Sequence, residues 1–129
     1  MELRDAHVLI TGASRGLGAG LAHSFAEAGA NVSLVARSAE PLEALAERLN
    51  GVALAADLLD PAQVAGLIDR VAQTAGEPVD VVVNNAGIDL TQSLDDFTHA
   101  DLSRLAELNL VVPLELARQA LPGMRERGR

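Results

Sequence analysis

The strongest constraint on the fold is a regular alternation of short apolar runs with longer segments of helical periodicity. The runs are five or six residues long, rich in Val, Leu and Ala, and apolar on both faces. This pattern is typical of parallel strands buried between two helix layers. The runs lie at 7–11, 31–36, 52–56 and 79–84. Strands and helices alternating at this spacing predict right-handed βαβ units and a doubly wound parallel sheet of the α/β class.

The intervening segments predict helices with one apolar face each. In the first, the apolar stripe is formed by Leu17, Leu21, Ala22, Phe25 and Ala28, and Gly29 ends it. The four predicted helical segments are 17–29, 39–51, 60–76 and 98–108.

Two of these helices carry clear start signals. Asp60 followed by Pro61 is typical of an N-cap and a first helical position. Thr98 and Asp101 have the spacing of a capping box.

The last segment, 108–126, differs because its apolar residues go most of the way around a helix. We expect a helix buried on more than one side, either by its own domain or by another subunit. Pro113 fits a first turn or else kinks the helix, and Pro122 and Gly123 weaken its end.

Composition limits the function classes. A chain of 129 residues with 49% hydrophobic content supports one domain, 1–129, with a core of Ala, Leu and Val because aromatic residues make up only 2%. A formal charge of −8 argues against nucleic acid as a partner. There is no Cys, and His7, His23 and His99 lack metal-ligand spacing, so we expect no metal site. Without a signal peptide or a membrane-spanning run, we expect a cytoplasmic protein.

The first strand-to-helix junction reads TGASRGLG, residues 11–18. Gly12 allows a sharp turn, Gly16 allows a pyrophosphate to approach the backbone, and Gly18 allows the helix to pack close to the strands. The helix N-terminus then presents unpaired N–H groups to the phosphates. Together with its position after the first strand, this turn predicts dinucleotide binding, with a purely structural turn as the alternative.

Four motifs in order resemble the short-chain dehydrogenase/reductase family. TGASRGLG resembles its T-G-x-x-x-G-x-G signature, NNAG (84–87) its second signature, and Asp57-Leu58 the pair it places around adenine. The segment from Asn109 resembles the one that begins with its structural and catalytic Asn. The ketoacyl-acyl-carrier-protein reductase branch is especially similar. The resemblance implies a Rossmann-like fold, truncated after about four strands and their helices.

The resemblance also implies the cofactor contacts. Asp57 would accept from the adenine amino group beside Leu58, Asn84 would tie strands together, and the next three residues would follow the ribose. Asp57 as a turn residue and Gly87 as a plain turn glycine are the alternatives. The expected cofactor-binding residues are Gly12, Ser14, Arg15, Gly16, Leu17, Gly18, Arg37, Ser38, Asp57, Leu58, Asn85, Ala86 and Gly87.

The end of the second strand favours NADP(H) over NAD(H). NAD-binding proteins of this fold place an acidic residue there, but this chain has Ala36. Arg37 and Ser38 can bind a 2′-phosphate, and Arg15 is a second cation for it.

Members of the family transfer hydride with a Tyr, a Lys, a Ser and an Asn. Of these four residues only the Asn has a counterpart here, Asn109, and the chain contains no Tyr. Asn109 is a catalytic candidate, with a helix-kink or strand-linking role as the alternative. We expect the N-terminal half of an NADP(H)-dependent oxidoreductase, inactive alone, whose full-length parent acts on a small carbonyl or alcohol substrate. The final helix, 108–126, is expected to pack in a homo-oligomer interface. The alternative function is a non-enzymatic dinucleotide-binding or interaction module.

Overall fold

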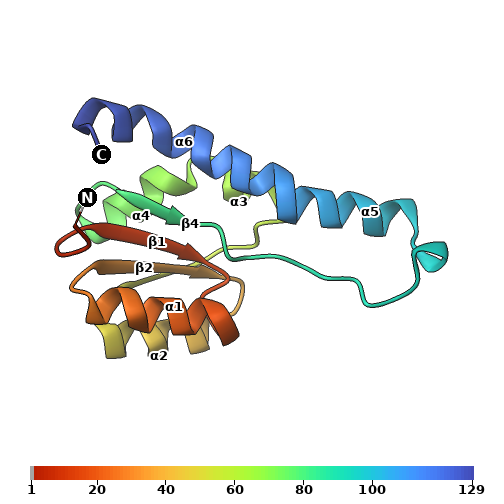
Figure 1. Cartoon of the computed structure of the whole chain (residues 1–129), viewed down its shortest axis with the longest axis horizontal. Helices are drawn as coiled ribbons and strands as arrows, with labels where there is room; N and C mark the ends of the chain where they lie inside the picture. Colours follow the sequence, from red (N-terminus) through yellow and green to blue (C-terminus); the bar gives the residue numbers. More distant parts are fainter. Residues whose placement is uncertain (1) are drawn as a thin grey trace.

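A computed structural model describes residues 2–129 as a parallel sheet between two layers of helices (Figure 1). Helices α1 and α2 cover one face, and α3, α4 and α6 cover the other (Figure 1). The elements are β1 (His7–Thr11), α1 (Gly16–Glu27), β2 (Asn31–Ala36), α2 (Ala39–Leu49), β3 (Val52–Ala55), α3 (Pro61–Val64), α4 (Leu67–Ala75), β4 (Val81–Val83), the short 3-10 helix η1 (Leu94–Asp96), α5 (His99–Ala106), the π-helical turn η2 (Glu107–Val111) and α6 (Val112–Arg127).

The sheet has the order β3-β2-β1-β4 with every pair parallel, so the predicted fold class is confirmed. Val8 in β1 pairs with Val32 on one side and Val81 on the other. The first two strands have the predicted bounds, whereas β3 and β4 are shorter than predicted. The central strands β1 and β2 are almost wholly buried, but the edge strands are only partly buried because each has one neighbour.

The apolar stripe predicted for the first helix is only partly correct. Ala22 is buried against the sheet, and Leu21 and Phe25 pack against the same core. Leu17 and Ala28 are exposed. Leu17 lies in the first turn of α1, beside the cavity at the carboxyl ends of the strands, and Ala28 lies just past the end of the helix.

The single helix predicted over 60–76 is wrong, because α3 and α4 are separate. Ala65 leaves the α-helical path with ψ 124°, and Gly66 follows in a left-handed conformation with φ +64°. The guanidinium of Arg70 donates to the carbonyl oxygens of Gln63 and Ala65, the latter at 2.6 Å, which satisfies carbonyls at the break. The predicted start is confirmed, since the Asp60 carboxylate accepts from the Ala62 N–H at 3.0 Å.

Helices α5 and α6 are joined through η2 into one long helical segment (Figure 1). The predicted capping box is present, with Thr98 and Asp101 each accepting a backbone hydrogen bond from the other. Pro113 lies in the first turn of α6, directly after the π-helical turn, where its missing N–H is tolerated. The helix continues past Pro122 and Gly123 to Arg127. Among the helices of residues 2–129, none combines the length and apolarity needed to cross a lipid bilayer.

Helix α6 buries only one of its apolar faces within this chain. Val112, Leu116 and Ala120 are buried in the core below the helix. On the other side, Leu114 is 63% exposed and Leu121 43%, and Leu110 in the preceding turn η2 is 58% exposed. The sequence predicted that either the domain itself or another subunit buries this segment. The domain buries one apolar side of the helix and leaves the other side exposed.

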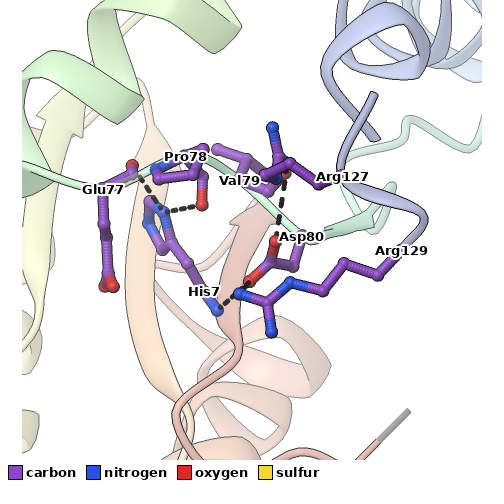
Figure 2. A network of polar contacts seen from close by, with 7 residues as sticks. All are labelled: His7, Glu77, Pro78, Val79, Asp80, Arg127 and Arg129. Carbon is purple, nitrogen blue, oxygen red and sulfur yellow. Dashed lines mark hydrogen bonds and ion pairs between the residues drawn. The ribbon is translucent and has the colours of Figure 1, made fainter. Parts of the chain in front are cut away.

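The far end of α6 is attached to the sheet by a buried carboxylate, that of Asp80 (Figure 2). Asp80 is 5% exposed and lies just before β4. It accepts from the His7 backbone N–H at 3.2 Å and pairs with the guanidinium groups of Arg127 at 3.4 Å and Arg129 at 3.0 Å. Arg127 also donates to the Val79 carbonyl at 2.7 Å. One carboxylate thus joins β1, the start of β4 and the end of the last helix.

The His7 ring lies in the same network and is 1% exposed (Figure 2). Its Nδ1 faces the carbonyl oxygens of Glu77 and Pro78, both at 3.2 Å, so Nδ1 carries the proton and donates. Its Nε2 then accepts from the Ser33 hydroxyl at 2.7 Å. His7 is therefore a satisfied core histidine that links β1 to β2 and to the loop before β4.

We predict that Asp80→Asn lowers the free energy of unfolding by about 2–3 kcal/mol. The amide keeps an acceptor for the His7 N–H but loses both ion pairs, and half-exposed Arg129 keeps the loss below that of a fully buried pair. Urea denaturation followed by far-ultraviolet circular dichroism measures the change, since the chain has no Trp or Tyr. Arg118→Gln, which removes an exposed ion pair from the same helix, is the control and should leave the midpoint unchanged. Equal effects of the two variants would contradict the attachment.

Candidate cofactor site

A cavity of about 700 Å³ opens at the carboxyl ends of the strands. It is lined by the turns that follow β1, β2, β3 and β4 and by one side of α5 and η2. In open parallel sheets, ligands bind at this edge. The structure brings all of the expected cofactor-binding residues to this one cavity, namely Gly12, Ser14, Arg15, Gly16, Leu17, Gly18, Arg37, Ser38, Asp57, Leu58, Asn85, Ala86 and Gly87.

The glycine turn packs against the loop that follows β4. Gly12 has φ +64°, and a Cβ there would lie 2.8 Å from the Ala86 Cα. A Cβ on Gly18 would lie 2.5 Å from Asn85 Nδ2 and would overlap the Gly12 carbonyl oxygen. Gly16 also has a positive φ, +58°, but its missing Cβ faces open space. Gly12 and Gly18 therefore permit close packing, and Gly16 leaves room for a ligand to approach.

Thr11 and Asn85 hold the two loops together. The Thr11 hydroxyl accepts from the N–H groups of Asn85 at 3.1 Å and Ala86 at 3.0 Å. The Asn85 amide donates to the carbonyl oxygens of Thr11 at 3.0 Å and Gly12 at 3.2 Å. The strand-tying role that the resemblance implied for Asn84 is thus performed by Asn85, while Asn84 is exposed.

The N-terminus of α1 is left without a side-chain cap. Arg15 is the N-cap residue, its side chain makes no capping hydrogen bond, and the first turn contains no acidic residue. The first N–H groups of this twelve-residue helix and the positive end of its dipole therefore remain available at the cavity. Such a helix end favours a bound anion.

The cavity is basic although the chain carries a formal charge of −8. Arg15, Arg37 and Arg104 line it, against the single carboxylate of Asp57. One oxygen of that carboxylate accepts from the Leu59 N–H at 3.0 Å. Within residues 2–129, the three guanidinium groups make no ion pair. The lining therefore concentrates cationic charge where a phosphate group would lie.

A sequence profile described as short chain dehydrogenase matches residues 6–129. This chain belongs to the short-chain dehydrogenase family.

Relatives with assigned names fall in the same family. The chain is 34% identical over 126 residues to the ketoacyl reductase HetN of Nostoc. The aligned region spans 94% of this chain and 44% of HetN. It is 35% identical over 135 residues to a fatty acyl-CoA reductase of Mycobacterium tuberculosis, covering 99% of this chain and 46% of that protein. The chain therefore spans less than half the length of these short-chain dehydrogenase relatives.

Solved structures confirm the Rossmann-like fold. A 3-oxoacyl-(acyl-carrier-protein) reductase from Agrobacterium tumefaciens with NADP bound superposes with a TM-score of 0.86 at 35% identity, over 97% of this chain and 50% of that one. The L-sorbose reductase of Gluconobacter frateurii, complexed with NADPH and L-sorbose, has a TM-score of 0.85 at 32% identity, over 99% and 51% of the two chains.

Asn109, the catalytic candidate of the short-chain dehydrogenase resemblance, does not line the cavity. Its Oδ1 accepts from the Ile88 N–H at 3.0 Å, and its Nδ2 donates to the Ile88 carbonyl at 2.8 Å. Asn109 lies in the π-helical turn η2, so the side chain ties this turn to the loop after β4. These hydrogen bonds link a helical turn to a loop, and both the catalytic part and the structural alternatives for Asn109 stay predictions.

Several cavity residues were missed by sequence reasoning, chiefly Arg104 and Leu108. They lie four residues apart, so one helix face carries both. The capping box at Thr98 and the apolar positions after it set the phase of that face, and this signal could have identified Leu108. No group of three or more His, Asp or Glu side chains arranged to hold a metal ion occurs among residues 2–129.

We predict that Gly18→Ala destabilises the fold by about 3 kcal/mol, the upper end for overpacking, because the added methyl overlaps backbone and the Asn85 amide. Gly20→Ala is a matched control on the same helix, where nothing lies within 4 Å of the added Cβ. It should stabilise the chain by about 0.5–1 kcal/mol. Thermal melts of both variants check the pair, and a Gly18→Ala variant as stable as Gly20→Ala would contradict the close contact.

Proposed function

We propose that this chain forms the dinucleotide-binding part of an NADP(H)-dependent oxidoreductase acting on a small carbonyl or alcohol substrate. The observation that carries the proposal is the uncapped N-terminus of α1, which lies in the same cavity as three unpaired arginines. The NADP- and NADPH-bound structures among its neighbours support the same class of cofactor.

The cavity residues fit each part of the dinucleotide. The α1 N-terminus and the open space at Gly16 suit the pyrophosphate. Arg37, with Ser38 beside it, suits a 2′-phosphate, and Ala36 supplies no carboxylate to repel it. The Asp57 carboxylate keeps one oxygen free to accept from the adenine amino group. When bound, the nicotinamide cofactor supplies the hydride that is transferred.

These residues alone provide binding rather than turnover. Reduction of a carbonyl needs a proton donor aimed at the developing alkoxide, and the chain has no Tyr for that role. Both polar atoms of the Asn109 side chain bind the Ile88 backbone. We therefore expect cofactor binding without hydride transfer from residues 1–129.

The missing Tyr is also the observation that favours a second candidate, a non-enzymatic dinucleotide-binding or interaction module. Both candidates bind the cofactor, so binding does not separate them. The experiment that separates them measures NADPH oxidation by the intact gene product in the presence of a panel of ketones and aldehydes. Cofactor binding with no turnover of any carbonyl would favour the module.

We predict that NADPH binds about ten- to a hundredfold more tightly than NADH, and that Arg37→Ala removes the difference. One or two charge-assisted hydrogen bonds to the 2′-phosphate account for that factor. Isothermal titration calorimetry at low salt measures both affinities. Arg48→Ala removes an arginine of α2 that does not line the cavity and is the control. An Arg37→Ala variant that retains the preference would contradict the 2′-phosphate assignment.

We also propose that the exposed face of α6 packs against a second copy of this chain, through residues 108–126. Leu110, Leu114 and Leu121 project from one helix beyond the area that the chain itself covers. Exposed apolar groups gathered on one helix mark an association surface.

We predict that sedimentation equilibrium of the wild-type chain gives a dimer or larger species, and that replacing both Leu110 and Leu114 by Gln gives a monomer. Polar amides at these positions remove the apolar contact without changing the buried face of the helix. Leu94→Gln, at a leucine that is more exposed (73%) but lies in η1, is the control and should leave the association unchanged. A monomeric wild-type chain would overturn the proposed interface.

A further inference from the structure

Arg104 lines the cofactor cavity, but none of the cofactor contacts proposed above involves it. It lies in α5, which extends past the carboxyl ends of the strands on the α3 and α6 side of the sheet (Figure 1). It lines the same cavity as Leu58, after β3, and Leu108, four residues further along in the π-helical turn η2. Arg15 and Arg37, by contrast, come from the turns after β1 and β2.

The guanidinium of Arg104 makes no ion pair within 4.0 Å among residues 2–129. The acidic residue in its own helix, Asp101, is committed to the capping box: its Oδ2 accepts from the Thr98 N–H at 2.9 Å and hydroxyl at 2.7 Å. The hydrogen bonds from Thr98 are the main reason that the pKa of Asp101 lies below its ordinary value, and the charge of Arg104 adds a smaller effect in the same direction. Arg104 makes no hydrogen bond to it and remains exposed. An exposed cation that lines a cavity and makes no ion pair is available to bind a ligand.

The neighbours of Arg104 in the cavity select the kind of ligand group. Leu58 is 5% exposed and Leu108 9% exposed. The small surface that they show lines the cavity, and together they give it an apolar floor. An apolar floor beside a planar guanidinium matches a flat aromatic ring, which stacks on guanidinium and packs on aliphatic carbon. A phosphate would gain from the guanidinium but not from the two leucines.

We propose that Arg104 is a further cofactor-binding residue whose guanidinium stacks on the adenine base of the dinucleotide. This inference rests on the proposed function. It gives the arginines separate tasks, with Arg37 on the 2′-phosphate and Arg104 on the base. Arg104 therefore contributes affinity for adenine nucleotides of both kinds and does not contribute to the choice between NADPH and NADH.

Fragments of the cofactor test this division. The probes are adenosine, AMP and adenosine 2′,5′-bisphosphate, titrated by two-dimensional NMR, which also reports whether each variant is folded. We expect Arg104→Ala to weaken all three by a similar factor of about two to ten. Arg104→Lys should weaken them almost as much, because it keeps the charge but loses the planar group. Arg37→Ala should weaken the bisphosphate only, and Arg125→Ala on α6 should change nothing.

Three outcomes overturn the proposal. Unchanged affinities in Arg104→Ala remove Arg104 from the site. A loss confined to the bisphosphate, and restored by Arg104→Lys, assigns Arg104 to a phosphate instead of the base. In both cases NADPH still binds the wild-type chain, so the proposed function stands. A wild-type chain that binds neither NADPH nor any fragment overturns the proposed function together with this inference.

Discussion

The close contact between Gly18 and the Gly12 carbonyl is the constraint on which the site depends. It draws the first turn of α1 against the turn after β1, and no side chain larger than hydrogen fits between them. The Asn85 amide fills the remaining space and binds the same carbonyl at 3.2 Å. Three segments far apart in the sequence, the β1 turn, α1 and the loop after β4, are thus fixed relative to one another before any ligand is present.

The helix held by that contact, α1, has N–H groups at its N-terminus that no side-chain cap of the protein satisfies. The N-cap residues that helices favour carry a side chain that accepts from the first N–H groups, but α1 begins with Arg15, whose side chain can only donate. The arrangement costs stability in the free chain, and a bound anion restores it. Three arginines and one engaged carboxylate make the cavity attractive to anions in a chain that is acidic elsewhere. The site therefore couples cofactor binding to the stability of the fold.

Local patterns predicted the parts of the structure that local interactions decide. The bounds of β1 and β2 and the cap at Asp60 follow from strand periodicity and turn chemistry, whereas the cofactor candidates after β3 and β4 came from the family resemblance. The break at Ala65 and Gly66 was missed because the apolar spacing continues across it, and only the backbone conformation of these two residues interrupts the helix. The Asp80 network was missed for a different reason. Its members lie 47 and 73 residues apart, and no spacing rule joins them.

The last helical segment gains its position from attachments at both ends of β4. At the carboxyl end of that strand, Asn109 in the π-helical turn makes two hydrogen bonds to the backbone of Ile88. At the amino end, Asp80 pairs with Arg127 and Arg129. These two anchors, near opposite ends of the segment, fix both its direction and its rotation. The same rotation that buries Val112 and Leu116 turns Leu114 outward. It also carries Arg104, beyond the first anchor, over the cavity.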